Sequence, residues 1–505
     1  MAYTIKKYFK NSDNFLKLLQ TKNEIFWLKR GEMQVVQSFN DTIKSIKTYS
    51  RFLKENNVFV KKIKKSNDLL NLPVTDKNNY LRKYEFESLV IGGFFPRGGW
   101  VVSATSGSTG EPFYFPRTET QDLYYALTAE LYLRTNFEIH NKKTLYVNGF
   151  ALGIWIGGLF TYQAIKHIIE KNKYDLTIVN PGINKEEMLK VIKKLSPYYD
   201  QVIIGGYPPL IKDFIDFSND QGFDWSRVSK KFIFSAEGFS EEFRDYIAKH
   251  TNLKNIYKDT LNHYGTVDLG TMSYETPLSI LVRRFALENK NFFNALFGEG
   301  SRLPTLTQFI PEQFYFEELN GKLFCTSESG IPLIRYDLKD LGGVKKFSEV
   351  FKIAKEFGID LEKEIDKSGI KDTVWELPFV YVVERADFSI SLYGANVYPE
   401  NIRPVLLHDD FNQHLSGRFY IQVEHLENQD PRFNVHVELK KNVNIDNVSK
   451  ENLEISILKN LLKENSEYSI IYQSMGKKVF PNIVMWGYED HVNFKRGGKQ
   501  KWVIK

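Results

Sequence analysis

Residues 142–180 read KKTLYVNGFALGIWIGGLFTYQAIKHIIEKNKYDLTIVN, and they contain the pattern from which we predict the fold. A short apolar run at Leu145–Val147 precedes a helical stretch at Thr161–Lys171, and a second apolar run follows at Thr177–Val179. Short apolar runs predict buried strands, and longer amphipathic stretches predict helices. Strands that alternate with helices of this length form a parallel sheet through right-handed crossovers.

The same alternation continues to about residue 250. Further strands are expected at Val202–Ile204 and Phe232–Phe234, and further helices at Lys185–Leu195, Leu210–Phe217 and Ser240–His250. In a sheet of this kind, ligands bind beyond the carboxyl ends of the strands. We therefore predict an α/β fold in which a large N-terminal domain has mostly parallel sheets flanked by helices.

Chain length and a change of pattern predict a second domain. A chain of 505 residues is too long for one compact core. The first 70 residues have helical spacing and are expected to cover the large domain. After about Gly321 strand-like runs dominate, with one helix near Lys450–Leu462. We place the large domain at 1–383 and a small, mobile α+β domain at 384–505.

Composition argues against several classes of protein. The net charge of +6 comes from 68 basic and 62 acidic residues spread along the chain, which gives little support for a nucleic-acid or membrane partner. Cys325 is the only cysteine, so neither a disulfide nor a cysteine-rich zinc site is expected. The apolar stretch Val147–Phe160 is too short for a membrane span, which needs about 20 residues. The first residues do not resemble a secretory signal, so we expect a cytoplasmic protein.

The stretch Ser103–Pro112 reads SATSGSTGEP and is the strongest candidate for a ligand-binding loop. Glycines allow backbone N–H groups to converge on an anion, and hydroxyl side chains add donors. The alternative is a flexible surface loop, and no Gly-Lys-Ser/Thr follows as in a Walker loop. The candidate phosphate-binding residues are Thr105, Ser106, Gly107, Ser108, Thr109 and Gly110.

This loop resembles the phosphate loop of the adenylate-forming enzymes, especially phenylacetate–coenzyme A ligases and their capsule-biosynthesis relatives. Further segments similar to those of the family follow in the family's order along nearly the whole chain. They are Ser235–Gly238, Asn262–Asp268, Leu303–Phe309, Ile334–Asp340, Arg385–Asp387, Gly394–Pro399 and Gly498–Lys499. Each segment is weak evidence alone, and the argument rests on their joint order.

The resemblance implies a role for particular residues of the large domain. The backbone of Ala236, Glu237 and Gly238 would line the adenine. In the segment that contains Asn262, Gly265 and Thr266, Tyr264 would stack on adenine and Asp268 would help to hold Mg²⁺. Asp340 would bind both ribose hydroxyls, and Arg385 would contact the nucleotide.

The resemblance also implies roles near the domain boundary and the C-terminus. Asp387 would be the hinge about which the small domain turns, and Gly394 belongs to the stretch that follows it. Lys499 would be the cation of the adenylation step, assisted by Thr109 and Asp268.

The expected reaction uses Mg-ATP to convert a carboxylic acid into an acyl adenylate, and then transfers the acyl group to coenzyme A. The stretch Phe150–Phe160 suits an aryl or medium-sized apolar acid, or else it only packs the start of a buried helix. A carrier protein or an amine remains an alternative acceptor. Val267, Glu384 and Phe388 depart from the family pattern, which leaves a third alternative of a nucleotide-binding regulator without turnover. No zinc is expected.

Overall fold

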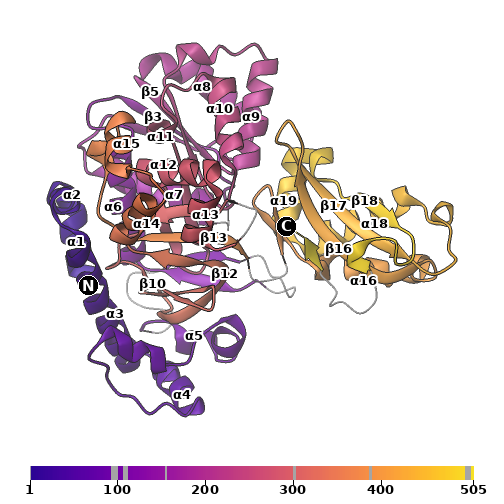
Figure 1. Ribbon diagram of the computed structural model, residues 1–505, viewed down its shortest axis with the longest axis horizontal. Helices are drawn as coiled ribbons and strands as arrows, with labels where there is room; N and C mark the ends of the chain where they lie inside the picture. The colour runs from indigo at the N-terminus through magenta and orange to yellow at the C-terminus, as the bar shows by residue number, and fades with distance from the viewer. Residues whose placement is uncertain are drawn as a thin grey trace. The chain divides into compact units, whose positions relative to one another are not determined.

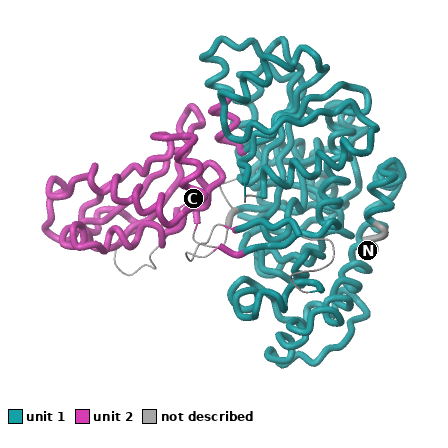
Figure 2. The backbone as a smooth tube through the Cα atoms, turned by 180° about the vertical axis from the view of Figure 1, so that it is seen from behind, with its two compact units in different colours: residues 1–104, 114–206, 215–386 teal, residues 105–113, 207–214, 387–505 magenta. Residues whose placement is uncertain are grey.

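The computed structural model describes residues 2–92, 100–105, 112–153, 156–299, 303–385, 389–494 and 502–504. The chain forms two compact units, which Figure 2 shows in different colours. Unit 1 comprises residues 1–104, 114–206 and 215–386. Unit 2 comprises residues 105–113, 207–214 and 387–505.

The main sheet of unit 1 has eleven strands among the described residues, in the order β10-β11-β12-β13-β9-β8-β7-β6-β5-β3-β4 (Figure 1). The strands β4, β3, β5, β6 and β7 pair in parallel, and the pairs from β7 to β10 are antiparallel. The bounds are β3 (Thr144–Asn148), β4 (Leu176–Val179), β5 (Gln201–Gly206), β6 (Lys230–Phe234), β7 (Thr260–Thr266), β8 (Gly270–Tyr274), β9 (Thr305–Gln308), β10 (Tyr315–Leu319), β11 (Lys322–Ser327), β12 (Leu333–Lys345) and β13 (Phe379–Arg385). A separate hairpin joins β1 (Val101–Ala104) to β2 (Tyr114–Arg117).

The predicted α/β fold with a smaller C-terminal domain is confirmed, but the sheet is mixed rather than mostly parallel. The parallel order holds where strands and helices alternate in the sequence. Between Thr266 and Gly270 the chain has only a short turn, which can join antiparallel strands but cannot make the crossover that parallel strands need. The strands after β7 therefore continue the sheet in the antiparallel sense.

Helices flank the sheet of unit 1, and one of the helices below, α9, is divided between the two units. Their bounds are α1 (Ala2–Lys10), α2 (Ser12–Thr21), α3 (Glu24–Ser45), α4 (Lys47–Glu55), α5 (Phe86–Leu89), α6 (Glu119–Thr135), α7 (Ile156–Glu170), α8 (Lys185–Leu195), α9 (Pro208–Asp220), α10 (Glu241–Thr251), α11 (Ile256–Asp259), α12 (Pro277–Glu288), α13 (Lys290–Phe297), α14 (Phe347–Glu356) and α15 (Leu361–Lys367). The predicted helix at Lys185–Leu195 coincides with α8, and the predicted strands at Leu145–Val147 and Val202–Ile204 lie within β3 and β5.

Helix α6 lies at the centre of the main core. All of its residues from Gln121 to Leu133 are buried, which is expected of a helix that packs on both sides. On one side it packs with Tyr146, Ile203 and Ile233 of the sheet, and on the other with apolar residues of α1 and α2. The N-terminal helices thus complete the core of unit 1.

Unit 2 is an α+β unit with a four-stranded sheet in the order β18-β17-β16-β19 and a two-stranded hairpin, β14-β15, among its described residues. The strand bounds are β14 (Ile390–Leu392), β15 (Ala395–Val397), β16 (Leu415–His425), β17 (Pro431–Leu439), β18 (Asn482–Trp486) and β19 (Val503–Ile504). The helices are α16 (Arg403–Leu406), α17 (Asp409–Asn412), α18 (Lys450–Glu464) and α19 (Ser466–Met475).

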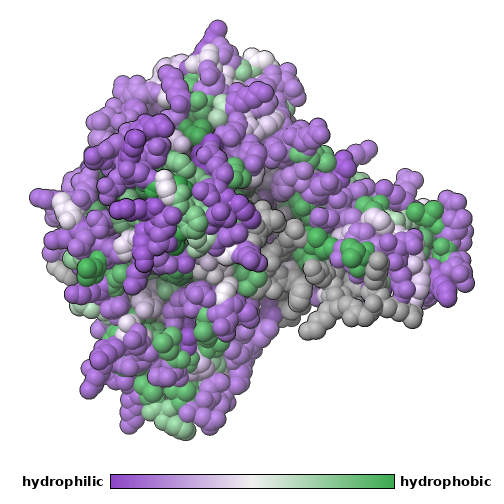
Figure 3. Space-filling model, viewed as in Figure 1, coloured by the Kyte–Doolittle hydropathy of each residue, from purple (hydrophilic) through white to green (hydrophobic). Residues whose placement is uncertain are grey.

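The visible surface is mostly hydrophilic, with hydrophobic residues scattered among charged ones (Figure 3). None of the helices in the described ranges combines the length and the apolar character that crossing a bilayer requires.

A buried ion network supports the end of β8. Glu275 follows β8 and accepts hydrogen bonds from Arg244 of α10 at 2.9 Å and from Arg283 of α12 at 2.8 Å. Arg283 also pairs with Glu241 at 2.7 Å, and all four side chains are almost fully buried. The backbone N–H of Glu275 donates to the carbonyl of Asn262 at 2.7 Å, so the network is tied directly to β7.

We expect Glu275→Gln to lower the free energy of unfolding of the protein by about 3–5 kcal/mol, because two buried guanidinium groups lose a shared charge partner. Denaturant titration followed by circular dichroism measures this change. Glu242→Gln, an exposed position on the same helix as Glu241, is the matched control and should change stability by less than about 0.5 kcal/mol. Equal effects of the two substitutions would show that the network does not stabilise the fold.

Candidate functional site

The β7-β8 hairpin carries five of the residues that the sequence assigns to the nucleotide site. Asn262, Tyr264, Gly265 and Thr266 belong to β7, and Asp268 lies in the turn to β8. A β-bulge interrupts the pairing between Tyr264 and Gly265. A Cβ atom on Gly265 would approach the carbonyl oxygen of Gly270 to 2.5 Å, so only glycine fits here. Thr266 Oγ1 accepts a hydrogen bond from the backbone of Leu269 at 3.2 Å, which orders the turn around Asp268.

Tyr264 and Asp340 are brought together although they lie on different strands. The Tyr264 hydroxyl donates to Asp340 Oδ2 at 2.6 Å, and both side chains are buried. The Tyr264 ring also stacks with Phe316 of β10, with centroids 6.2 Å apart. The residue predicted to stack on adenine therefore lies beside the residue predicted to bind the ribose.

Arg385 lies opposite Asp340 in the register of β12 and β13. Its backbone belongs to β13, whereas its side chain lies outside the described residues. The backbone of Arg385, which is predicted to contact the nucleotide, thus lies on the strand next to Asp340, the residue predicted to bind the ribose.

Asp268 is held by two groups, one of which the sequence did not predict. The Tyr336 hydroxyl of β12 donates to Asp268 Oδ2 at 2.5 Å, and the Lys77 ammonium lies 3.5 Å from Oδ1. Burial raises the pKa of Tyr336 well above its usual value, and the Asp268 carboxylate raises it further. Tyr336 therefore remains a proton donor to Asp268. Tyr336 lies in the Ile334–Asp340 segment, and this position could have identified it as a site residue. Nothing in the sequence distinguished Lys77 from other lysines.

The segment before Lys77 is fixed to β12. Thr75 forms a parallel bridge with Tyr336, donates from its backbone to Arg335 at 3.1 Å and accepts from Asp337 at 2.8 Å. Lys339 pairs with both Asp76 and Asp337 at 2.8 Å. Because Thr75 and Asp76 are both bound to β12, the Lys77 side chain starts from a fixed position.

The donor set at Asp268 is compatible with a magnesium ion that a substrate brings with it. No group of three or more His, Cys, Asp or Glu side chains that could hold a metal occurs among the described residues. Mg²⁺ is commonly held by one or two carboxylates together with substrate phosphates. Asp268 offers one such carboxylate, so it fits a metal that arrives with nucleotide phosphates better than a permanent metal site.

The segment Ser235–Gly238 follows β6 at the carboxyl end of the parallel strands. Ala236 has a φ of +76°, which costs free energy in any residue with a side chain. A Cβ atom on Gly238 would approach Thr305 Oγ1 to 2.7 Å. Asn262 Nδ2 donates to the carbonyl of Glu237 at 3.1 Å, whereas the buried Oδ1 of Asn262 has no hydrogen-bond partner among the described residues. The strained backbone is therefore tied to β7, beside the Tyr264–Asp340 pair.

Two of the predicted site residues that the structure describes, Thr105 and Gly394, belong to unit 2. The Thr105 N–H donates to the carbonyl of Phe113 at 3.0 Å, and the Phe113 N–H donates to Thr105 Oγ1 at 3.1 Å. Gly394, with a φ of +87°, and Tyr393, with a φ of +51°, form the two-residue turn of the β14-β15 hairpin. Positive φ at both positions is typical of a type I′ turn, which accounts for the glycine.

Several predicted residues lie outside the described part of the chain. They are Ser106, Gly107, Ser108, Thr109 and Gly110 of the phosphate loop, Asp387 at the predicted hinge, and Lys499.

The stretch predicted to line the acyl site is buried only in part where it is described, and Leu152 is exposed. Phe150 and Phe160 are buried, and Phe160 stacks on Tyr125 of α6 with centroids 4.6 Å apart. A Cβ atom on Gly270 would approach the Phe160 ring to 2.8 Å. Phe160 therefore fills the space between α6 and the β7-β8 hairpin, as the packing alternative predicts.

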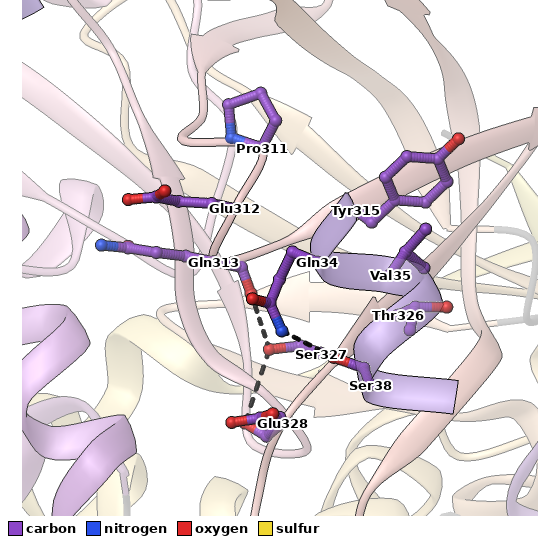
Figure 4. Close-up of a pocket in the computed structure, with 10 residues that line it drawn as sticks. All are labelled: Gln34, Val35, Ser38, Pro311, Glu312, Gln313, Tyr315, Thr326, Ser327 and Glu328. Carbon is purple, nitrogen blue, oxygen red and sulfur yellow. Dashed lines mark hydrogen bonds between the residues drawn. The ribbon is translucent and has the colours of Figure 1, made fainter. Parts of the chain in front are cut away.

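A separate pocket in unit 1 contains none of the predicted site residues (Figure 4). Residues of α3, including Gln34 and Ser38, line one side of it, and Gln313, Ser327 and Glu328 line the other. Its volume is about 200 Å³ including open solvent, below the 300–1,000 Å³ typical of small-molecule sites. We do not assign a ligand to it.

Comparison with solved structures identifies the fold. The structure is similar to that of 2-hydroxyisobutyryl-CoA ligase in complex with 2-HIB-AMP and CoA in the thioesterification state, with a TM-score of 0.59 and 15% sequence identity over 95% of this chain and 89% of that chain. An open conformation of the same ligase in complex with 2-HIB-AMP and CoA gives a TM-score of 0.50 and 14% identity over 93% and 90% of the two chains. No protein-family model and no curated protein sequence matches this chain. The chain therefore shares the fold of this ligase.

The carboxyl group of Glu328, which lines this pocket, leads to a prediction about how the stability of the protein depends on pH. Burial raises its pKa to about 7, and Asp41 contributes to the increase. Between pH 4.5 and pH 7 the folded chain then binds more protons at this position than the unfolded chain, so this carboxyl lowers stability as the pH rises. We expect Glu328→Gln to stabilise the protein by about 1–3 kcal/mol near pH 8 and to have little effect near pH 4. Thermal unfolding across this range tests it, with the exposed Glu362→Gln as the control, and a pH-independent effect would contradict it.

Proposed function

We propose that this chain is an adenylate-forming ligase that activates a carboxylic acid with ATP, releases pyrophosphate and transfers the acyl group to coenzyme A. The observation that carries the proposal is the hydrogen bond between Tyr264 and Asp340. It joins the two residues to which the sequence assigns adenine and ribose, within a fold shared with a ligase whose structure contains an acyl adenylate and CoA. No other pair of predicted site side chains in the described ranges is linked so directly.

In the proposed first step, a carboxylate oxygen of the acid attacks the α-phosphorus of ATP. The bond between the α-phosphorus and the bridging oxygen breaks, and pyrophosphate leaves with that electron pair. Tyr264 would present its ring to the adenine, and Asp340 would accept hydrogen bonds from the ribose hydroxyls. The buried position of Asp340 strengthens such bonds because few water molecules compete for its oxygens.

Negative charge that develops on the phosphate oxygens requires positively charged groups or hydrogen-bond donors in fixed positions. Lys499, Thr109 and the glycine-rich loop Thr105–Gly110 are the proposed donors. Mg²⁺ bound with the nucleotide would neutralise part of this charge, and Asp268 would hold it. Tyr336 keeps the Asp268 carboxylate oriented.

In the proposed second step, the coenzyme A thiol loses its proton and attacks the acyl carbonyl carbon. A thioester forms and AMP leaves. The small domain 384–505 would turn about Asp387 between the two steps and withdraw Lys499. The acid is proposed to be aryl or medium-sized and apolar, as in the phenylacetate–coenzyme A ligases that the sequence resembles.

Pyrophosphate exchange with a panel of carboxylic acids, followed by AMP release with and without coenzyme A, tests the whole proposal. We expect exchange with at least one acid and AMP release that depends on the thiol. If ATP binds and no acid supports exchange, the proposal fails and a regulatory nucleotide site remains. If AMP is released equally well without the thiol, coenzyme A is not the acceptor.

Asp340→Ala should weaken ATP binding strongly, because two hydrogen bonds to a charged carboxylate are lost, each contributing about 1.5–3 kcal/mol. Tyr264→Phe is the matched variant: it loses the hydroxyl bound to Asp340 but keeps the ring that would stack on adenine. We expect it to bind ATP within about tenfold of the parent chain, since it loses one hydrogen bond between neighbouring side chains. Titration calorimetry measures both. Unchanged affinity in Asp340→Ala would remove Asp340 from the site.

Lys499→Ala should lower the adenylation rate by about 10²–10³-fold, the range for the loss of one charge-stabilising donor. Thioester formation from a supplied acyl adenylate should change little, because the charge on the leaving pyrophosphate is absent from that step. Lys501→Ala is the control from the same basic segment. If Lys501→Ala abolished pyrophosphate exchange and Lys499→Ala did not, the assignment of Lys499 would be wrong.

A further inference from the structure

The segment between α4 and residue 71 exposes apolar side chains that are normally buried. The Phe59 side chain is 78% exposed, and Leu70, which lies eleven residues later in the same segment, is 65% exposed. Figure 3 shows hydrophobic residues among hydrophilic ones at the end of unit 1 where Figure 1 places α4. A protruding phenylalanine loses free energy in water, so its exposure calls for a functional explanation.

The same segment concentrates positive charge that the chain neutralises only in part. Lys61, Lys62, Lys64 and Lys65 are all exposed, and none of them forms an ion pair with any residue that the structure describes. The chain as a whole carries a small net charge, so this cluster is a local feature.

The nearby acidic side chains are already engaged. Asp68 Oδ2 accepts hydrogen bonds from the backbone N–H groups of Lys64 at 2.9 Å and of Lys65 at 3.1 Å, and these bonds lower its pKa. Glu55 is bound by Lys83 and Arg51, both at 2.7 Å. The Asp68 carboxylate offsets part of the charge of Lys64 and Lys65, and an excess of positive charge remains in the segment.

The segment is held in place on unit 1. Ile63 is buried, and its backbone exchanges two hydrogen bonds with the side chain of Asn40 of α3, at 3.0 and 3.1 Å. The Val58 N–H donates to the carbonyl of Leu53 at 2.9 Å, which fixes the chain just before Phe59. The lysines on both sides of Ile63 consequently project from an anchored point of the backbone.

We propose that residues 58–65 are a contact site for an anionic lipid membrane, with Phe59 inserted at the level of the headgroups. Lysines near an anionic bilayer bind it electrostatically, and an aromatic ring beside them suits the membrane interface. A protein partner is usually held by a groove or a cluster of apolar residues. Here the exposed Phe59 lies beside a mainly positive group of side chains and no apolar groove accompanies it among the described residues, which favours lipid. This mode of contact needs no spanning helix and does not depend on the proposed ligase activity.

The test is co-sedimentation of the full-length chain with vesicles of phosphatidylcholine alone or of an equal mixture of phosphatidylcholine and phosphatidylserine. We expect binding to the mixed vesicles only, weakened by added salt. The variant K61Q/K62Q/K64Q/K65Q should reduce the partition coefficient on the order of 600-fold, because each of the four lysines near an anionic surface contributes about fivefold. Phe59→Ser should reduce it about tenfold, since the ring no longer leaves water.

A control variant removes the same charge elsewhere on unit 1. K352Q/K355Q/K363Q/K367Q alters four exposed lysines of α14 and α15 and should leave vesicle binding unchanged. Equal binding to neutral and anionic vesicles, an equal loss in the control variant, or full binding by Phe59→Ser would each overturn the proposal. Circular dichroism of every variant verifies that the fold is retained.

Discussion

Two reciprocal hydrogen bonds between β7 and β12 define the candidate site. Tyr264 of β7 donates to Asp340 of β12, and Tyr336 of β12 donates to Asp268 at the end of the β7-β8 turn. Three strands, β8, β9 and β13, lie between β7 and β12 in the sheet. Four interstrand steps would span about 19 Å in a flat sheet, more than a tyrosine side chain reaches. The antiparallel half of the sheet must therefore curl so that β7 and β12 approach each other at the candidate site.

The irregularities of the antiparallel strands are consistent with this curvature. Register shifts interrupt the pairing between Tyr264 and Gly265, between Leu341 and Gly342, and at two places between β11 and β12. Bulges bend a strand and increase its twist. At Gly342 a Cβ atom would approach the carbonyl oxygen of Tyr381 to 1.9 Å, so a side chain there would push the neighbouring strand away. Glu275, whose side chain belongs to the buried ion network, also ties the two strands of the same hairpin together, because its backbone N–H donates to the carbonyl of Asn262.

Local patterns in the sequence predicted the parallel half of the fold well. The apolar runs of β3, β5 and β6 and the amphipathic stretch of α8 are set by neighbours in the sequence, so short windows identify them. The antiparallel half depends on which turns are short and where the strands bulge, which periodicity does not encode. The sequence therefore predicted a mostly parallel sheet, whereas the sheet is mixed.

The candidate site, like the fold, could be predicted only in part. Tyr264, Asp268 and Asp340 stand in segments with recognisable order, and the structure brings them into one hydrogen-bonded region. Lys77 lies almost 200 residues before Asp268 in a segment with no distinguishing composition, and only tertiary packing brings them together. The strained Ala236 likewise has no signal in its residue type, because its positive φ is imposed by the turn after β6.

The position of Lys77 changes how any cation meets Asp268. A buried carboxylate without a counterion would be unstable, and the Lys77 ammonium at 3.5 Å supplies that counterion from within the chain. Association of a metal with Asp268, as proposed above, would then be an ion exchange in which one positive charge replaces another. Such a site has a low affinity for free divalent ions, because a bound ion must displace the ammonium group. Its selectivity then depends on the phosphate groups that accompany the incoming ion. In the proposed function, Lys77 would thus disfavour free metal ions at Asp268 and leave the carboxylate available to a metal that arrives with a polyphosphate.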